Sequence, residues 1–330
     1  MNTFVFTCGD INGIGPEICI KSFNKLYDNQ KNRIVFICPG NVFESAISLV
    51  KPSFNFQLVK KLPAKFDKEQ IIVLDIGKFD QRYGVPTKES GFASFLSIVQ
   101  AFKIISRMPN SAVITAPISK TAFKLAGKNY PGHTELFAEL CRSKNYLMIF
   151  LSNNLICGLA TIHVPVKKIS GMITKQSLRN SLKILYNSLE KDLGIENPSL
   201  AVLGLNPHAG EAANIGKEEI NFIAPAIKSM KNRSIQGPFV PDAFFGMQRH
   251  KEFNAVLGMY HDQVLIPFKL LNFNTGVNYT AGLKIIRTSP DHGTGYDIAG
   301  RGTANSESML EAVRWAEIII ENRAKKKNES

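Results

Sequence analysis

Short apolar runs alternate with amphipathic stretches along the whole of this 330-residue chain, and that alternation is what most constrains the fold. Thr3–Thr7 and Arg33–Cys38 have the composition of buried strands. Between them a helix is predicted to begin at Pro16, a residue type favoured in the first helical turn. Strands that alternate with helices are typical of units in which consecutive strands run parallel. The sequence therefore predicts an α/β fold with largely parallel sheets.

The remaining elements are predicted from the same two patterns, short apolar runs for strands and amphipathic stretches for helices. Ser308 and Glu311 have the spacing of a capping box, which predicts that the last helix starts at Ser308 and runs to about Arg323. The other predicted helices cover residues 90–108, 120–126, 134–143, 175–193 and 217–230, and the other predicted strands cover residues 71–76, 112–115, 146–151, 155–162, 200–205 and 255–259.

Three of the six histidines follow predicted strands: His163, His208 and His261 come after the strands at 155–162, 200–205 and 255–259. In open α/β sheets, ligands bind beyond the carboxyl ends of the strands, and imidazole is a common ligand of zinc and related metals. A single histidine in such a place is typical of a hydrogen-bonded turn residue, and the separations match no local zinc motif. The three histidines thus suggest a metal site assembled by folding, while the turn interpretation stays open.

Composition argues against several classes of protein. The formal net charge is +13, but the basic residues are scattered, with one short run at the C-terminal tail. This pattern argues against nucleic acid as a partner and favours small anionic substrates. No apolar stretch reaches the ~18 residues that a membrane-spanning helix requires, and no basic segment resembles the start of a signal peptide. We therefore expect no membrane association and a cytoplasmic location, in which the five dispersed cysteines are free, buried thiols.

Six segments rich in Gly, His, Asp and Asn resemble, in order, the motifs of the 4-hydroxythreonine-4-phosphate dehydrogenase family, over nearly the whole chain. They are residues 9–17 (GDINGIGPE), 115–120 (TAPISK), 132–135 (GHTE), 206–211 (NPHAGE), 260–263 (YHDQ) and 287–302 (RTSPDHGTGYDIAGRG). Within the last segment, residues 292–300 also resemble the adenosine-binding loop of isocitrate and isopropylmalate dehydrogenases.

The resemblance implies a fold and an activity. The fold would consist of two interleaved α/β/α domains, as in isocitrate and isopropylmalate dehydrogenases, with the active site in the interdomain cleft. The first domain would comprise residues 1–126 with 284–330, and the second, residues 127–283, would carry the metal ligands and the dimer contacts. The activity would be the oxidation of 4-phosphooxy-L-threonine by NAD or NADP with a divalent metal (zinc, magnesium or cobalt), in pyridoxine 5′-phosphate biosynthesis.

The resemblance also implies roles for particular residues. The metal would be bound by His163, His208 and His261, in a site shared between the two subunits of a homodimer. The small, anionic, phosphorylated substrate would be bound by His133, Thr134, Lys269, Asn278 and Arg287. Asp242 is a candidate catalytic residue near the metal, and Asp10 is a structural or cofactor neighbour. The candidate cofactor-binding residues are His292, Gly293, Thr294 and Asp297.

Some positions depart from the motifs or lie outside them. Ile11-Asn12 stands where Pro-Ala is commoner in the family, Ala212-Ala213 replaces glycines, and Val264 replaces another frequent glycine. His250 matches no motif, and we expect it to be an exposed turn residue. The single tryptophan, Trp315, is expected to pack against the core.

Other functions remain open at this point. A sister dehydrogenase acting on another phosphorylated or carboxylated hydroxy acid would use the same scaffold. A zinc hydrolase is a further alternative, because three histidines and a water also describe hydrolytic zinc sites. That alternative leaves the glycine-rich segment 292–302 unexplained. A nucleic-acid-binding module would require an affinity for duplex that depends strongly on salt.

Overall fold

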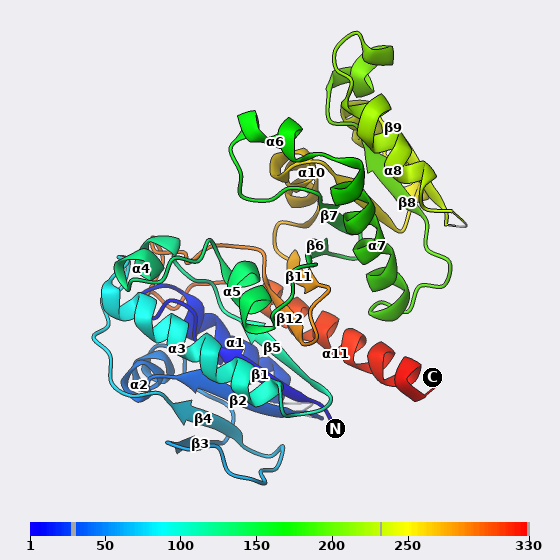
Figure 1. Cartoon of the computed structure of the whole chain (residues 1–330). Coiled ribbons are helices and arrows are strands. Elements are labelled where there is room, and N and C mark those ends of the chain that lie inside the picture. The colour runs from blue at the N-terminus through cyan, green and yellow to red at the C-terminus, as the bar shows by residue number, and fades with distance from the viewer. Residues whose placement is uncertain (28–30, 232, 329–330) are drawn as a thin grey trace. The chain divides into compact units, whose positions relative to one another are not determined.

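The structure, a computed structural model, describes residues 1–27, 31–231 and 233–328 (Figure 1). By packing, the chain divides into two compact units. Unit 1 comprises residues 1–142 and 284–324, and unit 2 comprises residues 143–283 and 325–330. The predicted domain boundaries stay a prediction, because a unit defined by close contacts is not by itself a folding domain.

Unit 1 contains six strands that all run parallel, in the order β3-β4-β2-β1-β5-β12. The strands are β1 (Thr3–Thr7), β2 (Arg33–Cys38), β3 (Phe56–Val59), β4 (Ile71–Asp75), β5 (Ser111–Thr115) and β12 (Ile286–Pro290). The helices are α1 (Gly15–Tyr27), α2 (Gly40–Leu49), α3 (Lys88–Ile105), α4 (Lys120–Leu125), α5 (His133–Leu140) and α11 (Glu307–Asn328). Helix α3 lies across the strands and packs on β1, β2 and β5 (Figure 1).

Unit 2 contains six more strands, in the order β11-β6-β7-β10-β8-β9. Strands β7, β10, β8 and β9 run parallel, whereas β6 is antiparallel to both β7 and β11. The strands are β6 (Leu147–Leu151), β7 (Cys157–Leu159), β8 (Leu200–Leu203), β9 (Ile235–Phe239), β10 (Ala255–Gly258) and β11 (Val277–Ala281). The helices are α6 (Val166–Met172), α7 (Lys175–Lys191), α8 (Ala224–Lys228), α9 (Pro241–Gly246) and α10 (His261–Asn272), with short turns η1 (Pro207–Ala213), η2 (Glu219–Ile223) and η3 (Arg249–Glu252).

The predicted fold class is confirmed: the protein is α/β with largely parallel strands. The predicted strands and helices recur with shifted ends, and one predicted helix is divided. Residues 217–230 form η2 and α8, with Pro225, which lacks an N–H group, in the first turn of α8. Strand β12 was not predicted because three of its five residues, Arg287, Thr288 and Ser289, are polar although all are buried.

Two expectations about single residues are wrong, and two are confirmed. His250 is buried rather than exposed, and the centroid of its ring lies 5.9 Å from that of Phe245. The last helix was predicted to start at Ser308 with a capping box and to run to about Arg323, but it spans Glu307–Asn328, so Ser308 lies inside it and its hydroxyl accepts a hydrogen bond from Asp291 N. Trp315 is buried, as expected, and all five cysteines are free. Four of the thiols are buried, and that of Cys141 is half-buried.

Candidate active site

A buried arginine is the electrostatic centre of the candidate site in unit 1. Arg287 lies on β12, beside Val113 of β5, and only 3% of it is exposed. Its Nη2 donates to the hydroxyls of Thr115 (2.8 Å) and Ser289 (2.7 Å). Burial lowers the pKa of Arg287 to about 9, and the nearby carboxylate of Glu135 opposes that shift. The side chain is therefore still cationic at neutral pH. Because burial removes the water that would solvate this charge, an anionic ligand would stabilise it.

His133 and Thr134 lie at the start of α5, near this arginine. Thr134 is buried, and the Nε2 atom of His133 is buried without a hydrogen-bond partner in the described chain. Burial, assisted by the positive charge of Arg287, lowers the pKa of His133 well below its ordinary value. His133 is therefore neutral at pH 7. The first N–H groups of a helix favour an anion, so α5 and Arg287 together have the chemistry of a phosphate or carboxylate site.

The two hydroxyls that hold Arg287 were missed as site residues from the sequence. Thr115 ends β5 within the TAPISK motif, and Ser289 follows Arg287 by two residues on β12. Thr115 lies within a motif, but the sequence gave no indication of its role. Nothing in the sequence distinguished Ser289 from an ordinary serine in a β-strand. Glu135 also lies within a motif, and its negative charge raises the pKa of Arg287, opposing the effect of burial.

The glycine-rich turn after β1 packs backbone to backbone against the loop after β12. Ile14 N donates to Thr294 O over 2.9 Å, and a Cβ at Gly13 would lie only 2.6 Å from the same oxygen. The position of Gly13 therefore requires glycine. The hydroxyl of Tyr296 donates to Asp10 Oδ2 (2.9 Å), and burial raises the pKa of Asp10. Asp10 thus fixes the predicted cofactor loop against the first turn.

The predicted cofactor-binding residues all lie on this loop. The Nδ1 atom of His292 is 3.1 Å from Gly293 O, and a side chain at Gly293 would meet open space. Asp297 is exposed, whereas Thr294 is partly buried. An open, glycine-bearing loop that follows a parallel strand fits the close approach of a nucleotide to the backbone.

In unit 2, the three predicted metal-binding histidines lie in the segments that follow adjacent parallel strands, and His261 is the first residue of α10. His163 follows β7, His261 follows β10 and His208 follows β8, and β10 pairs with both β7 and β8. The carboxyl ends of parallel strands meet at one edge of a sheet. Asp242 lies just beyond β9, the next parallel strand, and is exposed at the start of α9.

The loops after β7 and β10 are joined directly. Thr161 donates to Met259 O through its N–H (3.1 Å) and its hydroxyl (2.7 Å). The rings of His163 and His261 have their centroids 6.0 Å apart. The Nδ1 atom of His261 is 2.7 Å from Asp262 Oδ1. That carboxylate would hold the proton on Nδ1 and leave Nε2 as a metal-binding atom, which is the usual arrangement of a metal-ligating histidine.

The loop that carries His208 has an unusual backbone. His208, Ala209, Glu211, Ala212 and Ala213 all have positive φ, between 42° and 77°. A residue with a side chain loses roughly 1–2 kcal/mol in this left-handed conformation, and such strain is often found at functional sites. Glycines, which the family more often has at positions 212 and 213, would adopt this conformation without strain.

A buried carboxylate anchors this strained loop. Glu219, which is 3% exposed, accepts hydrogen bonds at Oε1 from Leu205 N and Asn206 N, both 2.8 Å, and at Oε2 from Asn206 Nδ2 (3.0 Å). Gln263 joins the neighbouring strand ends, since its Nε2 donates to Gly204 O (2.7 Å). Sequence reasoning missed Glu219, because a glutamate in a predicted helix is usually a surface residue.

The structure thus brings two of the three histidines together and places the third on a neighbouring loop. In the part of the chain that the structure describes, no group of three or more His, Cys, Asp or Glu side chains is close enough to hold a metal ion. The chemistry of the donors nevertheless fits a divalent cation, because imidazole nitrogens and a carboxylate at one sheet edge are its usual ligands.

The two other predicted substrate-binding residues are also in unit 2. Lys269 is half-buried on α10, two helical turns beyond His261. Asn278 is half-buried on β11, opposite Phe150 of β6.

Comparison with known proteins places this architecture among metabolic dehydrogenases. Residues 30–316 match the family model described as pyridoxal phosphate biosynthetic protein PdxA. The chain belongs to that family.

No helix in the described residues is long and apolar enough to cross a membrane.

Individual relatives are similar over nearly their whole length. The chain is 38% identical to a 4-hydroxythreonine-4-phosphate dehydrogenase of Sulfurihydrogenibium sp. (strain YO3AOP1) over 323 residues, which cover 97% of this chain and 98% of the relative. It is 42% identical to the enzyme of that name from Desulfosudis oleivorans, with 94% of each covered. The crystal structure of the enzyme of that name from Klebsiella pneumoniae matches with a TM-score of 0.83 and 35% identity, covering 97% of this chain and 100% of that one.

Proposed function

We propose that this protein is an NAD(P)-dependent, metal-dependent 4-hydroxythreonine-4-phosphate dehydrogenase. It oxidises the secondary alcohol of 4-phosphooxy-L-threonine to 2-amino-3-oxo-4-phosphooxybutanoate. That β-keto acid then loses carbon dioxide to give 3-amino-2-oxopropyl phosphate, in pyridoxine 5′-phosphate biosynthesis. The observation that carries the proposal is the buried, desolvated Arg287 in a chain whose relatives bear this enzyme name.

We assign the anionic groups of the substrate to five residues. In unit 1, Arg287 donates charge-assisted hydrogen bonds, while neutral His133 and Thr134 donate from the start of α5. In unit 2, Lys269 supplies a second cation and Asn278 an amide. Hydrogen bonds between ionised groups are roughly twice as strong as neutral ones, so Arg287 contributes most to affinity.

We assign the divalent metal, zinc, magnesium or cobalt, to His163, His208 and His261. A metal bound by three neutral imidazoles would supply Lewis acidity that lowers the pKa of the substrate alcohol. The protein's part is to orient the rings, which Asp262 does for His261 through its contact with Nδ1. Asp242 is our candidate for accepting the alcohol proton, because it is exposed at the same edge of the parallel strands.

We assign the nicotinamide dinucleotide, NAD or NADP, to His292, Gly293, Thr294 and Asp297. The cofactor would supply the acceptor for the hydride that leaves the carbinol carbon. The turn at Gly13 and Asp10 would hold this loop in place before the cofactor binds.

We further propose that the protein works as a cytoplasmic homodimer with the metal site shared between subunits. The outer face of α10 supports a dimer, because Ile266, Leu270 and Phe273 are 60%, 82% and 75% exposed. Large apolar side chains gathered on one surface usually mark an interface. Light scattering should give twice the mass of one chain.

The decisive test of the activity is nucleotide reduction, followed by absorbance of NADH or NADPH. Metal-stripped protein is mixed with 4-phosphooxy-L-threonine and NAD or NADP, with and without added zinc, magnesium or cobalt. We expect reduction only when metal is present, with release of carbon dioxide. Turnover of another phosphorylated or carboxylated hydroxy acid, and not of this one, would point to a sister dehydrogenase. Failure to bind either nucleotide or metal would overturn the assignment.

A further inference from the structure

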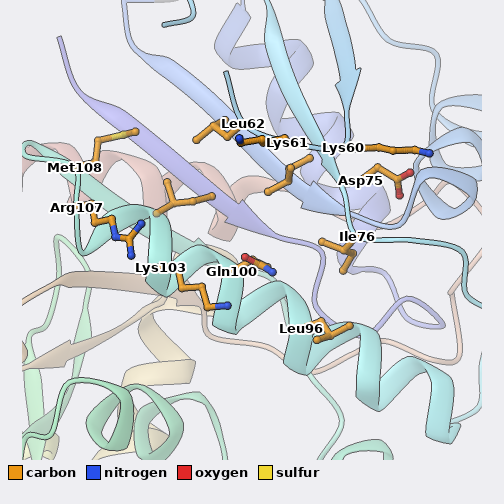
Figure 2. Close-up of a pocket in the computed structure, with 12 residues that line it drawn as sticks. Lys60, Lys61, Leu62, Asp75, Ile76, Leu96, Gln100, Lys103, Arg107 and Met108 are labelled. Carbon is orange, nitrogen blue, oxygen red and sulfur yellow. The ribbon is translucent and has the colours of Figure 1, made fainter. Parts of the chain in front are cut away.

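A cavity of about 590 Å³ in unit 1 is lined by α3 and the residues just after it, by the end of β4 and by the residues just after β3 (Figure 2). Its floor is apolar and includes Leu74 of β4 with Leu96, Ile104 and Met108 from α3 and the residues just after it. Pockets for small organic ligands usually measure roughly 300–1,000 Å³ and have mostly apolar walls. The cavity therefore has the size and the floor of a small-molecule site.

Four cations surround this floor. Lys60 and Lys61 follow β3, while Lys103 lies in the last turn of α3 and Arg107 lies in the turn just after that helix. Figure 2 shows Gln100 and Lys103 on α3 and Arg107 beyond the end of that helix, all among the residues that line the cavity.

The positive charge of the cavity is not neutralised from within. Within the described ranges, no ion pair or hydrogen bond is made by the side chains of these four cations. Asp75 is the one carboxylate among the described residues that line the cavity, and its Oδ1 already accepts from Gly40 N (2.8 Å) and Gly77 N (2.9 Å). A cavity lined by four cations and one carboxylate carries a net positive charge, which attracts an anion.

The cavity is separate from the anion site built on Arg287 and shares no residue with it. Helix α3 has a second side whose hydroxyls hold the glycine-rich turn. Ser94 donates to Gly9 O (2.7 Å), and Ser90 donates to Asp10 Oδ2 (3.1 Å). The cavity therefore lies on a part of α3 that the proposed reaction leaves unused.

We propose that this cavity is a second ligand site, for an organic phosphate with an apolar or aromatic body. The body rests on the aliphatic floor, and the phosphate lies among the four cations. A ring compound with one phosphate, such as a nucleoside monophosphate or a phosphorylated pyridine, has the required size and charge. The inference goes beyond the dehydrogenase activity and does not depend on it.

The test is calorimetric titration of the full chain with AMP, pyridoxine 5′-phosphate and inorganic phosphate as three separate probes. The test variant is Lys103→Ala with Arg107→Ala, whose side chains are both exposed. The matched control is Lys51→Ala with Lys88→Ala, which removes two exposed cations of unit 1 that do not line the cavity. Circular dichroism checks that both variants fold.

We expect one of the two organic phosphates to bind wild type and control alike, and to bind the test variant about tenfold more weakly. The organic probe that binds more tightly identifies the source of the ligand. The Arg287→Met variant should retain this binding, because it alters only the other anion site. Equal affinity of the test variant and the control would overturn the proposal. Inorganic phosphate binding as tightly as either organic probe would also overturn it, since the floor would then contribute nothing.

Discussion

The anion site of unit 1 and the histidine edge of unit 2 are built in opposite ways. Arg287 is buried and held by hydroxyls from its own and the adjacent strand, so its position is part of the core. His163 and His208 are exposed on loops, and only the backbone beneath them is fixed. Under the proposed function, the charge of the substrate would be recognised by a preorganised interior, whereas the proposed metal ligands could be replaced with little loss of stability.

The largest effect should follow Arg287→Met, which keeps the volume of the side chain and removes its charge. Activity should fall about 10³-fold, because a buried charged partner of an anion is worth roughly 2–5 kcal/mol. Stability should change little, because the loss of the hydrogen bonds to Thr115 and Ser289 is offset by relief from burying a cation. Steady-state kinetics and urea unfolding measure the two quantities. Arg82→Met, which removes an exposed cation paired with Asp80, is the control and should keep full activity.

Glu219→Gln tests whether the histidine edge depends on its buried anchor. The variant should lose about 1–3 kcal/mol of stability, because a charged acceptor of two backbone N–H groups is weakened. Metal affinity should fall about tenfold, as it does when groups that orient metal ligands are changed. Thermal unfolding and metal titration provide the readouts, with exposed Glu196→Gln as the control. Unchanged metal affinity would show that the His208 loop holds its shape without Glu219.

The unit 1 site should also make stability depend on pH through His133. Its pKa is lowered in the folded state, so below the unfolded value of about 6.5 the unfolded chain binds more protons than the folded one. Its contribution is complete above that pH and is lost as the pH falls toward the folded pKa. Urea unfolding at pH 7.5 and 5.5 should show wild type losing up to about 1.4 kcal/mol more than His133→Asn. The same loss in both proteins would rule out His133 as the source.

The smallest expected effect concerns the left-handed loop. Ala213→Gly should raise stability by about 0.5–1 kcal/mol, since glycine removes the strain at φ 77° but adds freedom to the unfolded chain. Thermal unfolding measures this gain. A matched Ala226→Gly substitution in α8, where the backbone is helical, should destabilise the protein instead.

The sequence predicted the parts of this molecule that follow local rules. The three histidines were correctly predicted to follow strands, because an apolar run that ends in a polar turn is a local pattern; the pairing of those strands was not predicted. The roles of Thr115 and Ser289, whose hydroxyls accept hydrogen bonds from Arg287, and of Glu219 could not be predicted, because they arise from contacts between segments that the fold brings together. His250 was wrongly expected to be exposed for the same reason, because the absence of a motif around it gives no information on how the folded chain buries it.

The most direct test of the account is the metal content of wild type and of three single variants, His163→Ala, His208→Ala and His261→Ala. Each protein is equilibrated with zinc, dialysed and analysed for metal per chain, and its stability is measured in parallel. The account predicts one zinc per chain in wild type, loss of that zinc in all three variants, and stability within about 0.5 kcal/mol of wild type for exposed sites. Retention of zinc by His208→Ala would contradict it, because the loop after β8 would then lie outside the metal site.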